Sequence, residues 1–266
     1  MTGFDKDWLA LREPADLAAR HDGLVDDLAR HLAGMENARV LDIGCGTGST
    51  WRSLGDRLPA KVGWTLLDHD AELLEEAERR IGQNGKVAFR RHDLNDIDGL
   101  PLQGIEVVTA SALFDLCSER FCEAVADRLA SARIGLYAAL NYDGIMEWSL
   151  PHPLDRQMVD LFNRHQRTDK GFGPALGPDA TACLASLFAA RGYNVRIGNS
   201  PWRMDAGSTA LHVELLNGLR RPLLEISELS EETVAGWLEY RLLAIGQPGS
   251  SCRVGHTDII ALPVWL

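Results

Sequence analysis

The chain has 266 residues, of which 45% are hydrophobic and 24% are charged, a composition typical of a globular protein with a buried core. Its 27 basic and 38 acidic residues give a net charge of −11. Nucleic acid is therefore a poor candidate partner, because Lys and Arg supply most of the affinity for a phosphate backbone. We find no signal peptide and no stretch of 18 apolar residues, so we expect no membrane span and a cytoplasmic location.

The cysteines do not form a recognisable framework. Their number is odd, which argues against a closed set of disulfides, and no Cys/His group has the spacing of zinc ligands. We therefore expect free, buried thiols and no metal site. The five cysteines are Cys45, Cys117, Cys122, Cys183 and Cys252.

Strands alternate with helices along most of the chain, which predicts an α/β fold with a mainly parallel sheet. Residues 1–34 are predicted to form an N-terminal helical cap with two apolar stripes. We expect strands at 38–43, 62–67, 86–91, 105–110, 133–140, 193–197 and 256–262. We expect helices at 49–58, 72–82, 119–130, 154–165, 178–191, 207–220 and 230–245.

A glycine-rich segment follows the first predicted strand directly. Glycines 44, 46 and 48 lie where a predicted strand ends and a helix begins. The chain turns sharply at such a place, and a ligand can approach the backbone. A dinucleotide site requires G-x-G-x-x-G/A, and Ser49 stands at its third position. The preceding acid, Asp42, would also repel a diphosphate, so a nicotinamide oxidoreductase is the weaker alternative.

The pattern D-x-G-x-G-x-G, from Asp42 to Gly48, resembles motif I of class I methyltransferases, which use S-adenosylmethionine (SAM). The resemblance covers about residues 38–140. It implies an open, mostly parallel seven-stranded sheet with helices on both faces and an antiparallel last strand. An acid beside the glycine loop suits SAM, which carries an amino group and a sulfonium cation.

The same resemblance assigns further residues to the cofactor, each at the carboxyl end of a strand, where ligands bind in open α/β sheets. Asp68 would accept hydrogen bonds from the ribose hydroxyls, and Asp93 from the adenine amino group. We also expect Arg12, on the N-terminal helix, to pair with the SAM carboxylate. The complete predicted cofactor set is Arg12, Asp42, Gly44, Cys45, Gly46, Gly48, Asp68, His69, Asp93, Leu94 and Ser111.

The acceptor is less clearly encoded, because methyl transfer depends largely on positioning. The fourth strand does not end in Asn/Asp-Pro-Pro-Tyr/Phe, which makes DNA and exocyclic amines poorer candidates. Residues 141–177 interrupt the alternation where the family inserts specificity elements. We predict substrate contacts there from Tyr142, Glu147, Arg167, Asp169 and Lys170. His165 and Asp115 are competing candidates for a general base.

These patterns together predict a methyltransferase for a small-molecule acceptor. We assign the cap to residues 1–34 and the SAM-binding domain to 35–266, with insertions at about 141–177 and 207–246. An RNA or protein methyltransferase of the same fold, a non-catalytic SAM-binding protein and an aminopropyltransferase remain alternatives. A homodimer is one candidate for the oligomeric state.

Overall fold

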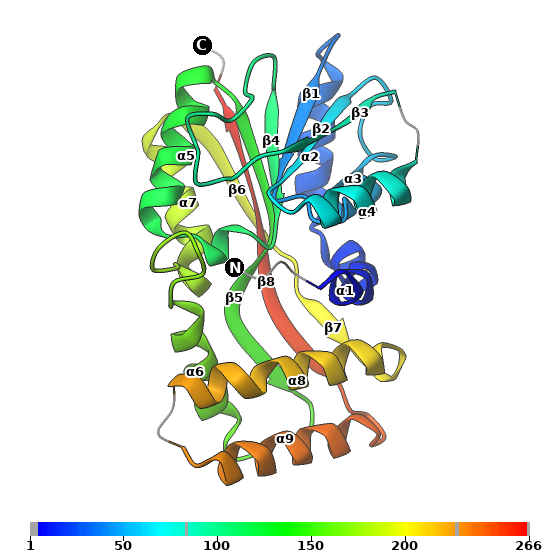
Figure 1. The fold of residues 1–266 in the computed structure, drawn as a ribbon, viewed down its shortest axis with the longest axis vertical. Helices are drawn as coiled ribbons and strands as arrows, with labels where there is room; N and C mark the ends of the chain where they lie inside the picture. The colour runs from blue at the N-terminus through cyan, green and yellow to red at the C-terminus, as the bar shows by residue number, and fades with distance from the viewer. Residues whose placement is uncertain (1–4, 83–84, 227–228, 265–266) are drawn as a thin grey trace.

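The computed structural model describes residues 5–82, 85–226 and 229–264; residues 1–4 of the predicted cap lie outside these ranges. Its centre is an eight-stranded sheet in the order β3-β2-β1-β4-β5-β8-β6, with β7 paired to β8 (Figure 1). The strands are β1 (Arg39–Ile43), β2 (Gly63–Asp68), β3 (Val87–Arg91), β4 (Val107–Ser111), β5 (Gly135–Trp148), β6 (Tyr193–Asn199), β7 (Trp202–Met204) and β8 (Cys252–Pro263).

Helices cover both faces of this sheet (Figure 1). Apolar side chains of α2, α3 and α4 share one buried cluster with β1 and β2, and those of α5 and α7 share another with β4 and β5. The helices are α1 (Lys6–Ala19), α2 (Asp22–Ala33), α3 (Ser49–Leu54), α4 (Ala71–Ile81), α5 (Glu119–Ala132), α6 (Asp155–Gln166), α7 (Ala180–Ala190), α8 (Thr209–Ile226) and α9 (Glu231–Ile245). The 3-10 turns are η1 (Phe114–Leu116), η2 (Gly177–Asp179) and η3 (Ala206–Ser208).

The predicted fold class is confirmed. Strands β1 to β5 pair in parallel, while β8 runs antiparallel between β5 and β6. Side chains cap several of these helices, because Asp70, Ser118 and Ser230 each accept a hydrogen bond from a backbone N–H in the first turn of the helix that follows.

Two strand predictions were incomplete. The short strand β7 was missed, and β5 continues to Trp148, so residues 141–148 of the predicted insertion are strand. The long β5 pairs with β8 beyond the parallel part of the sheet and forms an extension. Helices α6, α8 and α9 pack there around a third apolar core (Figure 1).

The strand β5 bends where the parallel part of the sheet meets this extension. Leu140 has a positive φ of 58°, and the β5–β8 register shifts between Ala138 and Asn141. The buried Asp258 stabilises the bend, since it accepts hydrogen bonds from the Leu140 N–H at 2.8 Å and the Tyr137 hydroxyl at 3.0 Å. It also accepts one from the backbone N–H of His21, between α1 and α2, at 3.0 Å.

Among the described residues, no helix has the length and apolarity needed to cross a membrane.

Replacement of Asp258 by alanine should lower the free energy of unfolding by about 3–5 kcal/mol, because it leaves two buried donors and one partly buried donor without their acceptor. Urea denaturation followed by circular dichroism measures this change. The matched control is Asp98→Ala, at a carboxylate that is 98% exposed, where we expect a change within about 0.5 kcal/mol. A loss below about 1 kcal/mol in Asp258→Ala would contradict the role of this carboxylate.

Candidate active site

The glycine loop joins β1 to α3 and needs its glycines for two different reasons. All three of Gly44, Gly46 and Gly48 have positive φ, which other residues rarely adopt. A Cβ on Gly48 would lie 2.9 Å from the Ile81 side chain, so the loop packs tightly on α4. A Cβ on Gly46 would lie 3.3 Å from the side chain of Leu9, so α1 covers the loop from the other side.

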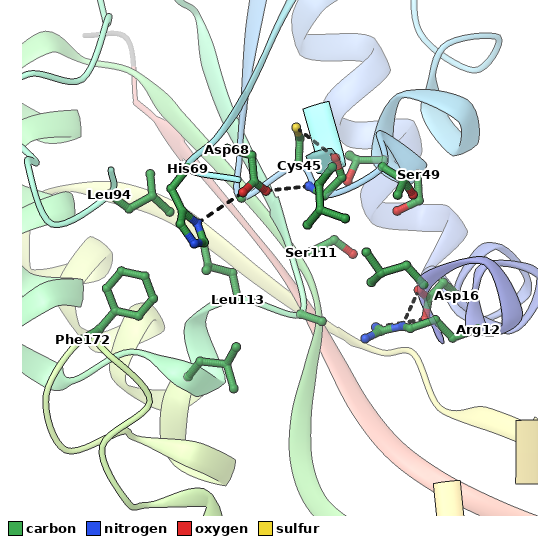
Figure 2. Close-up of a pocket in the computed structure, with 18 of the residues that line it drawn as sticks. Arg12, Asp16, Cys45, Ser49, Asp68, His69, Leu94, Ser111, Leu113 and Phe172 are labelled. Carbon is green, nitrogen blue, oxygen red and sulfur yellow. Dashed lines mark hydrogen bonds and ion pairs between the residues drawn. The ribbon is translucent and has the colours of Figure 1, made fainter. Parts of the chain in front are cut away.

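A cleft of about 1040 Å³, including its open mouth, lies between this loop, the carboxyl ends of the parallel strands and α1. Figure 2 shows Leu94 and Phe172 on one side of it and Arg12 and Asp16 on the other. The cleft is lined by Leu9, Arg12, Asp16, Gly44, Cys45, Gly46, Thr47, Ser49, Thr50, Asp68, His69, Leu73, Asp93, Leu94, Ser111, Ala112, Leu113, Leu116 and Phe172.

Nine of the eleven residues predicted to bind the cofactor are therefore brought together in one cleft. Those nine are Arg12, Gly44, Cys45, Gly46, Asp68, His69, Asp93, Leu94 and Ser111. The other two, Asp42 and Gly48, lie behind the lining and support the loop.

Asp68, at the end of β2, connects the glycine loop to the wall of the cleft. It is 6% exposed, and it accepts hydrogen bonds from the backbone N–H of Gly46 at 2.8 Å and of Asp70 at 3.0 Å. His69 Nδ1 lies 3.3 Å from the same carboxylate. Because a carboxylate offers about four lone-pair positions, Asp68 retains capacity for a ligand with two hydroxyl groups.

The next strand end contributes an exposed acid beside an apolar side chain. Asp93 follows β3 and accepts hydrogen bonds from the backbone N–H and side-chain amide of Asn95, and the backbone bond lowers its pKa. Leu94, beside it, is buried at 6% exposure. This pair offers an apolar contact and a polar acceptor to a flat, nitrogen-containing ring.

Asp42, on β1, is a fully buried carboxyl group. Its Oδ1 accepts a hydrogen bond from Thr109 at 2.7 Å, whereas Oδ2 has no hydrogen-bond partner among the described residues, although Thr50 lies nearby. Burial raises the pKa of Asp42 to about 7. The carboxyl group is therefore a titratable hydrogen-bonding group directly behind the glycine loop.

Arg12 lines the cleft as predicted, but it already has partners. It forms an ion pair with Asp16, with Nε 2.9 Å from Oδ2, and it stacks over Trp202 with its guanidinium carbon 5.1 Å from the ring centroid. Trp202 also donates to Asp16 at 2.9 Å. These contacts hold α1 against β7 and largely balance the charge of Arg12.

A second arginine, which the sequence analysis missed, lies behind the cleft wall. Arg20 donates from one terminal nitrogen to Ser111, a lining residue, at 3.2 Å. Its Nε and other terminal nitrogen are buried and have no hydrogen bond of normal geometry among the described residues. Burial opposes the charge of Arg20, but nearby Tyr137 and Asp258 outweigh it, so the pKa is raised. The only sequence signal was an arginine at the end of the first helix.

The residues predicted to contact the acceptor do not line the cleft. Tyr142 is buried in β5 and donates to Asn163 at 2.8 Å, while the exposed Glu147 pairs with Arg253 at 3.0 Å. The remaining members lie near the end of α6 or in the following loop, and each is hydrogen-bonded to a residue outside the predicted substrate set. These are Arg167 with Asp179, Asp169 with the N–H groups of Gly171 and Gly173, and Lys170 with His165.

The two candidate bases occupy different environments. His165 is outside the cleft lining, and its ring nitrogens lie 3.1 Å from Glu225 and 3.2 Å from Lys170. Asp115 belongs to η1, between the lining residues Leu113 and Leu116. Burial raises the pKa of Asp115 to about 6, opposed in part by the positive charge of Arg12. The role of either residue as a base stays a prediction.

Several lining residues had no clear signal in the sequence. Leu9 and Asp16 reach the cleft because α1 packs across the glycine loop, a tertiary contact that helical periodicity does not specify. Phe172 comes from the predicted insertion, between two glycines with positive φ that project the loop toward the cleft. The sequence offered one indication of this contact, an aromatic residue between two glycines.

All five cysteines are free thiols, and no group of His, Cys, Asp and Glu suited to a metal ion occurs within the described ranges.

The buried Asp42 predicts a specific pH dependence of stability. Because its pKa in the folded protein is about 7 and the ordinary value is 3.8, the folded state binds more protons across this window, and stability falls as pH rises through it. Asp42→Asn has no carboxyl group to lose a proton, so it does not lose stability in this way as pH rises. Its free energy of unfolding relative to wild type should increase by on the order of 1–3 kcal/mol between pH 4 and pH 8.

Urea titrations at the two pH values measure this difference, with Asp98→Asn as the exposed control. The same pH dependence in Asp42→Asn and in the wild type would show that this carboxyl group is not the source of the effect.

Residues 40–132 match the family model described as "Methyltransferase domain". No curated protein matches the chain. The chain is structurally similar to a cyclopropane-fatty-acyl-phospholipid synthase-like protein from Lactobacillus casei, with 16% identity, a TM-score of 0.55, and coverage of 96% of this chain and 92% of the other. It is also similar to YcgJ from Bacillus subtilis, with 13% identity, a TM-score of 0.53, and coverage of 92% and 100%.

A third similar structure is the cyclopropane synthase MmaA2 from Mycobacterium tuberculosis, with 15% identity, a TM-score of 0.52, and coverage of 97% and 94%. At these identities the likeness establishes the fold, while the family model establishes the domain. The glycine loop and the acids at the strand ends lie within the matched region. Residues 40–132 are therefore a methyltransferase domain, and the chain has the α/β fold of the class I, SAM-dependent methyltransferases.

Proposed function

We propose that this methyltransferase binds SAM in the cleft beside the glycine loop and methylates a small-molecule acceptor. The observation that carries the proposal is the convergence of nine predicted cofactor residues, from α1 and four strand ends, on one cleft. SAM supplies a methyl group on a sulfonium sulfur, so the protein must bind a nucleoside, a zwitterionic amino acid and a cation. The residues present fit each of these three parts.

The adenosine part fits the cleft between β2 and β3. Asp68 has unused lone pairs for the two ribose hydroxyls, beyond its bonds to the N–H groups of Gly46 and Asp70. Leu94 offers an apolar surface to the adenine ring, and Asp93 offers an acceptor to its amino group. These groups occur at the edge of the sheet where α/β proteins bind nucleosides.

The amino acid part fits the opposite end of the cleft, where charges of both signs lie close together. The unpartnered Asp42 Oδ2 and the nearby Asp16 favour a cationic ligand, and the glycine loop lets it approach the backbone. Arg20, with two unpartnered nitrogens and a bond to Ser111, is the better match for the carboxylate. Arg12 is a weaker match, because Asp16 already pairs with it.

Two features support a small acceptor. Helix α1 crosses the cleft, where Leu9 contacts the glycine loop and Glu13 forms an ion pair with Arg52 at 2.5 Å. The net charge of −11 disfavours the phosphate contacts that an RNA substrate would need. We also propose a homodimer and a cytoplasmic location, with Asp115 or His165 as the base and the predicted substrate residues outside the cofactor cleft.

Removal of the Asp68 carboxylate should abolish most of the affinity for the product S-adenosylhomocysteine. We expect Asp68→Ala to weaken binding by at least about 30-fold in a calorimetric titration, because two hydrogen bonds to a charged group are lost. The control Asp98→Ala should bind like the wild type. An affinity for Asp68→Ala within threefold of the wild-type value would refute the assignment.

The two arginines can be separated with a truncated ligand. Arg20→Met should weaken binding of S-adenosylhomocysteine by about tenfold or more, but leave that of 5′-methylthioadenosine, which lacks the amino acid part, within twofold. Arg12→Met should change the binding of both ligands by less than threefold. The reverse pattern would restore Arg12 as the carboxylate ligand, and equal losses for both ligands would show that Arg20 acts only on the structure.

A further inference from the structure

We propose that Phe172 is a cofactor-binding residue whose ring packs against the adenine of SAM, and that Asp169 is the residue that positions it. This role rests on the proposed function, in which SAM occupies the cleft with its adenine beside Leu94. The segment concerned is a short turn of the chain between α6 and η2, residues 169–174, which we call the Phe172 hairpin. Phe172, near its tip, lines the cleft.

A single carboxylate oxygen fixes the shape of the Phe172 hairpin. Asp169 Oδ1 accepts hydrogen bonds from the backbone N–H of Gly171 at 2.7 Å and of Gly173 at 3.1 Å. Both glycines have positive φ, 104° and 82°, which other residues rarely adopt. Asp169 also pairs with Pro174 across the turn as an isolated antiparallel bridge. The residues on both sides of Phe172 are therefore tied to the same oxygen, which sets the direction of its side chain.

The Phe172 hairpin is docked on the segment that follows β4. The ring of Phe172 lies 4.9 Å from that of Phe121, in the first turn of α5, with an angle of 57° between the ring planes. A Cβ on Gly173 would lie 3.3 Å from the side chain of Ser118, so the hairpin is in close contact with the start of α5. Phe172 is nonetheless only partly buried and lines the cleft. The ring is thus held from behind and presents its remaining surface to a ligand.

Phe172 lies at the end of the cleft in which we place the adenine. It packs against the apolar cluster that contains Leu94 and Leu113, and both of these leucines also line the cleft. Figure 2 shows Phe172 and Leu94 on one side of the cleft, with Arg12 and Asp16 on the other, where we place the amino acid part. Apolar side chains that follow β3 and β4, together with the hairpin, therefore border the adenine space.

The connectivity of SAM favours the adenine over the acceptor as the partner of Phe172. The sulfur of SAM bonds to the methyl group, to the ribose and to the amino acid chain, so the methyl group lies between the two ends of the cofactor. An acceptor must reach that middle part, beside Ser111, because the displacement is in line. A side chain at the adenine end meets the flat base first, and aromatic side chains stack on any base, since every base has a π face.

Substitution of Phe172 tests this contact with two ligands that share the adenine. Phe172→Ala should weaken the binding of S-adenosylhomocysteine and of 5′-methylthioadenosine by the same factor, at least about fivefold in calorimetric titrations, because the base loses its stacking partner. Phe172→Tyr keeps the ring and should bind both ligands within threefold of the wild type. Phe162→Ala is the control, at a partly buried aromatic residue of α6 that packs on the third apolar core, and it should change neither affinity by more than twofold.

Unchanged affinity for both ligands in Phe172→Ala would overturn the proposal. A loss confined to S-adenosylhomocysteine would also overturn it, because the contact would then be with the amino acid part. If Phe172→Ala does not fold, an NMR measurement on the wild type decides. With ¹³C-labelled phenylalanine rings and saturating S-adenosylhomocysteine, we expect nuclear Overhauser effects from the adenine protons to the ring whose signals are missing in Phe172→Tyr. The absence of these effects would overturn the proposal.

A conservative substitution tests the positioning role of Asp169. Asp169→Asn keeps an oxygen that can accept both backbone N–H groups, so it should bind 5′-methylthioadenosine within twofold of the wild type. Asp169→Ala should bind this ligand at least about threefold more weakly. In the Phe172→Ala background, Asp169→Ala should cause no further loss, because both substitutions act on one contact. Equal affinities of the two Asp169 variants, or a further loss in the double variant, would refute the positioning role.

The wild type separates this contact from the proposed function itself. Wild-type protein that binds neither S-adenosylhomocysteine nor 5′-methylthioadenosine would refute the proposed function. Wild-type binding that persists unchanged in Phe172→Ala would refute only the role of Phe172.

Discussion

The buried carboxylate of Asp258 fixes the geometry on which the rest of the structure depends. Its bonds to His21, Tyr137 and Leu140 join the start of α2, the middle of β5 and β8 at one point. The bend in β5 lets the sheet continue into an extension. The anchored chain before α2 places α1 across the glycine loop. The cleft therefore results from a long-range polar contact as much as from the strand ends around it.

Much of the parallel half of the molecule could be predicted from sequence, because its signals are local. A buried strand followed by the Gly44–Gly48 loop, and helix caps such as Asp70 and Ser118, require only neighbouring residues. Asp68 stands at the end of the second predicted strand, and the family resemblance assigned it to the cofactor, since the carboxyl ends of parallel strands share one edge. Those predictions concern the part of the site that is built by residues close to one another in the sequence.

The extension and the acceptor side could not be predicted in the same way. Residues 141–148 looked like the start of an insertion because their polar and glycine residues interrupt the alternation, yet pairing with β8 keeps them in a strand. The missed β7 has only three residues and depends on that same pairing. Asp16 and Phe172 reach the cleft, and Arg20 its wall at Ser111, through tertiary packing. Arg12 acquires partners, Asp16 and Trp202, that no local pattern indicates.

The most direct test of the account is a calorimetric titration of the purified wild-type protein with S-adenosylhomocysteine, with NAD and NADP titrated alongside. The account predicts one binding site per chain for S-adenosylhomocysteine and no heat of binding for either dinucleotide, because Asp42 and Asp68 favour a nucleoside with a cationic tail over a diphosphate. Binding of NAD or NADP without S-adenosylhomocysteine would contradict the account and assign the glycine loop to dinucleotide chemistry.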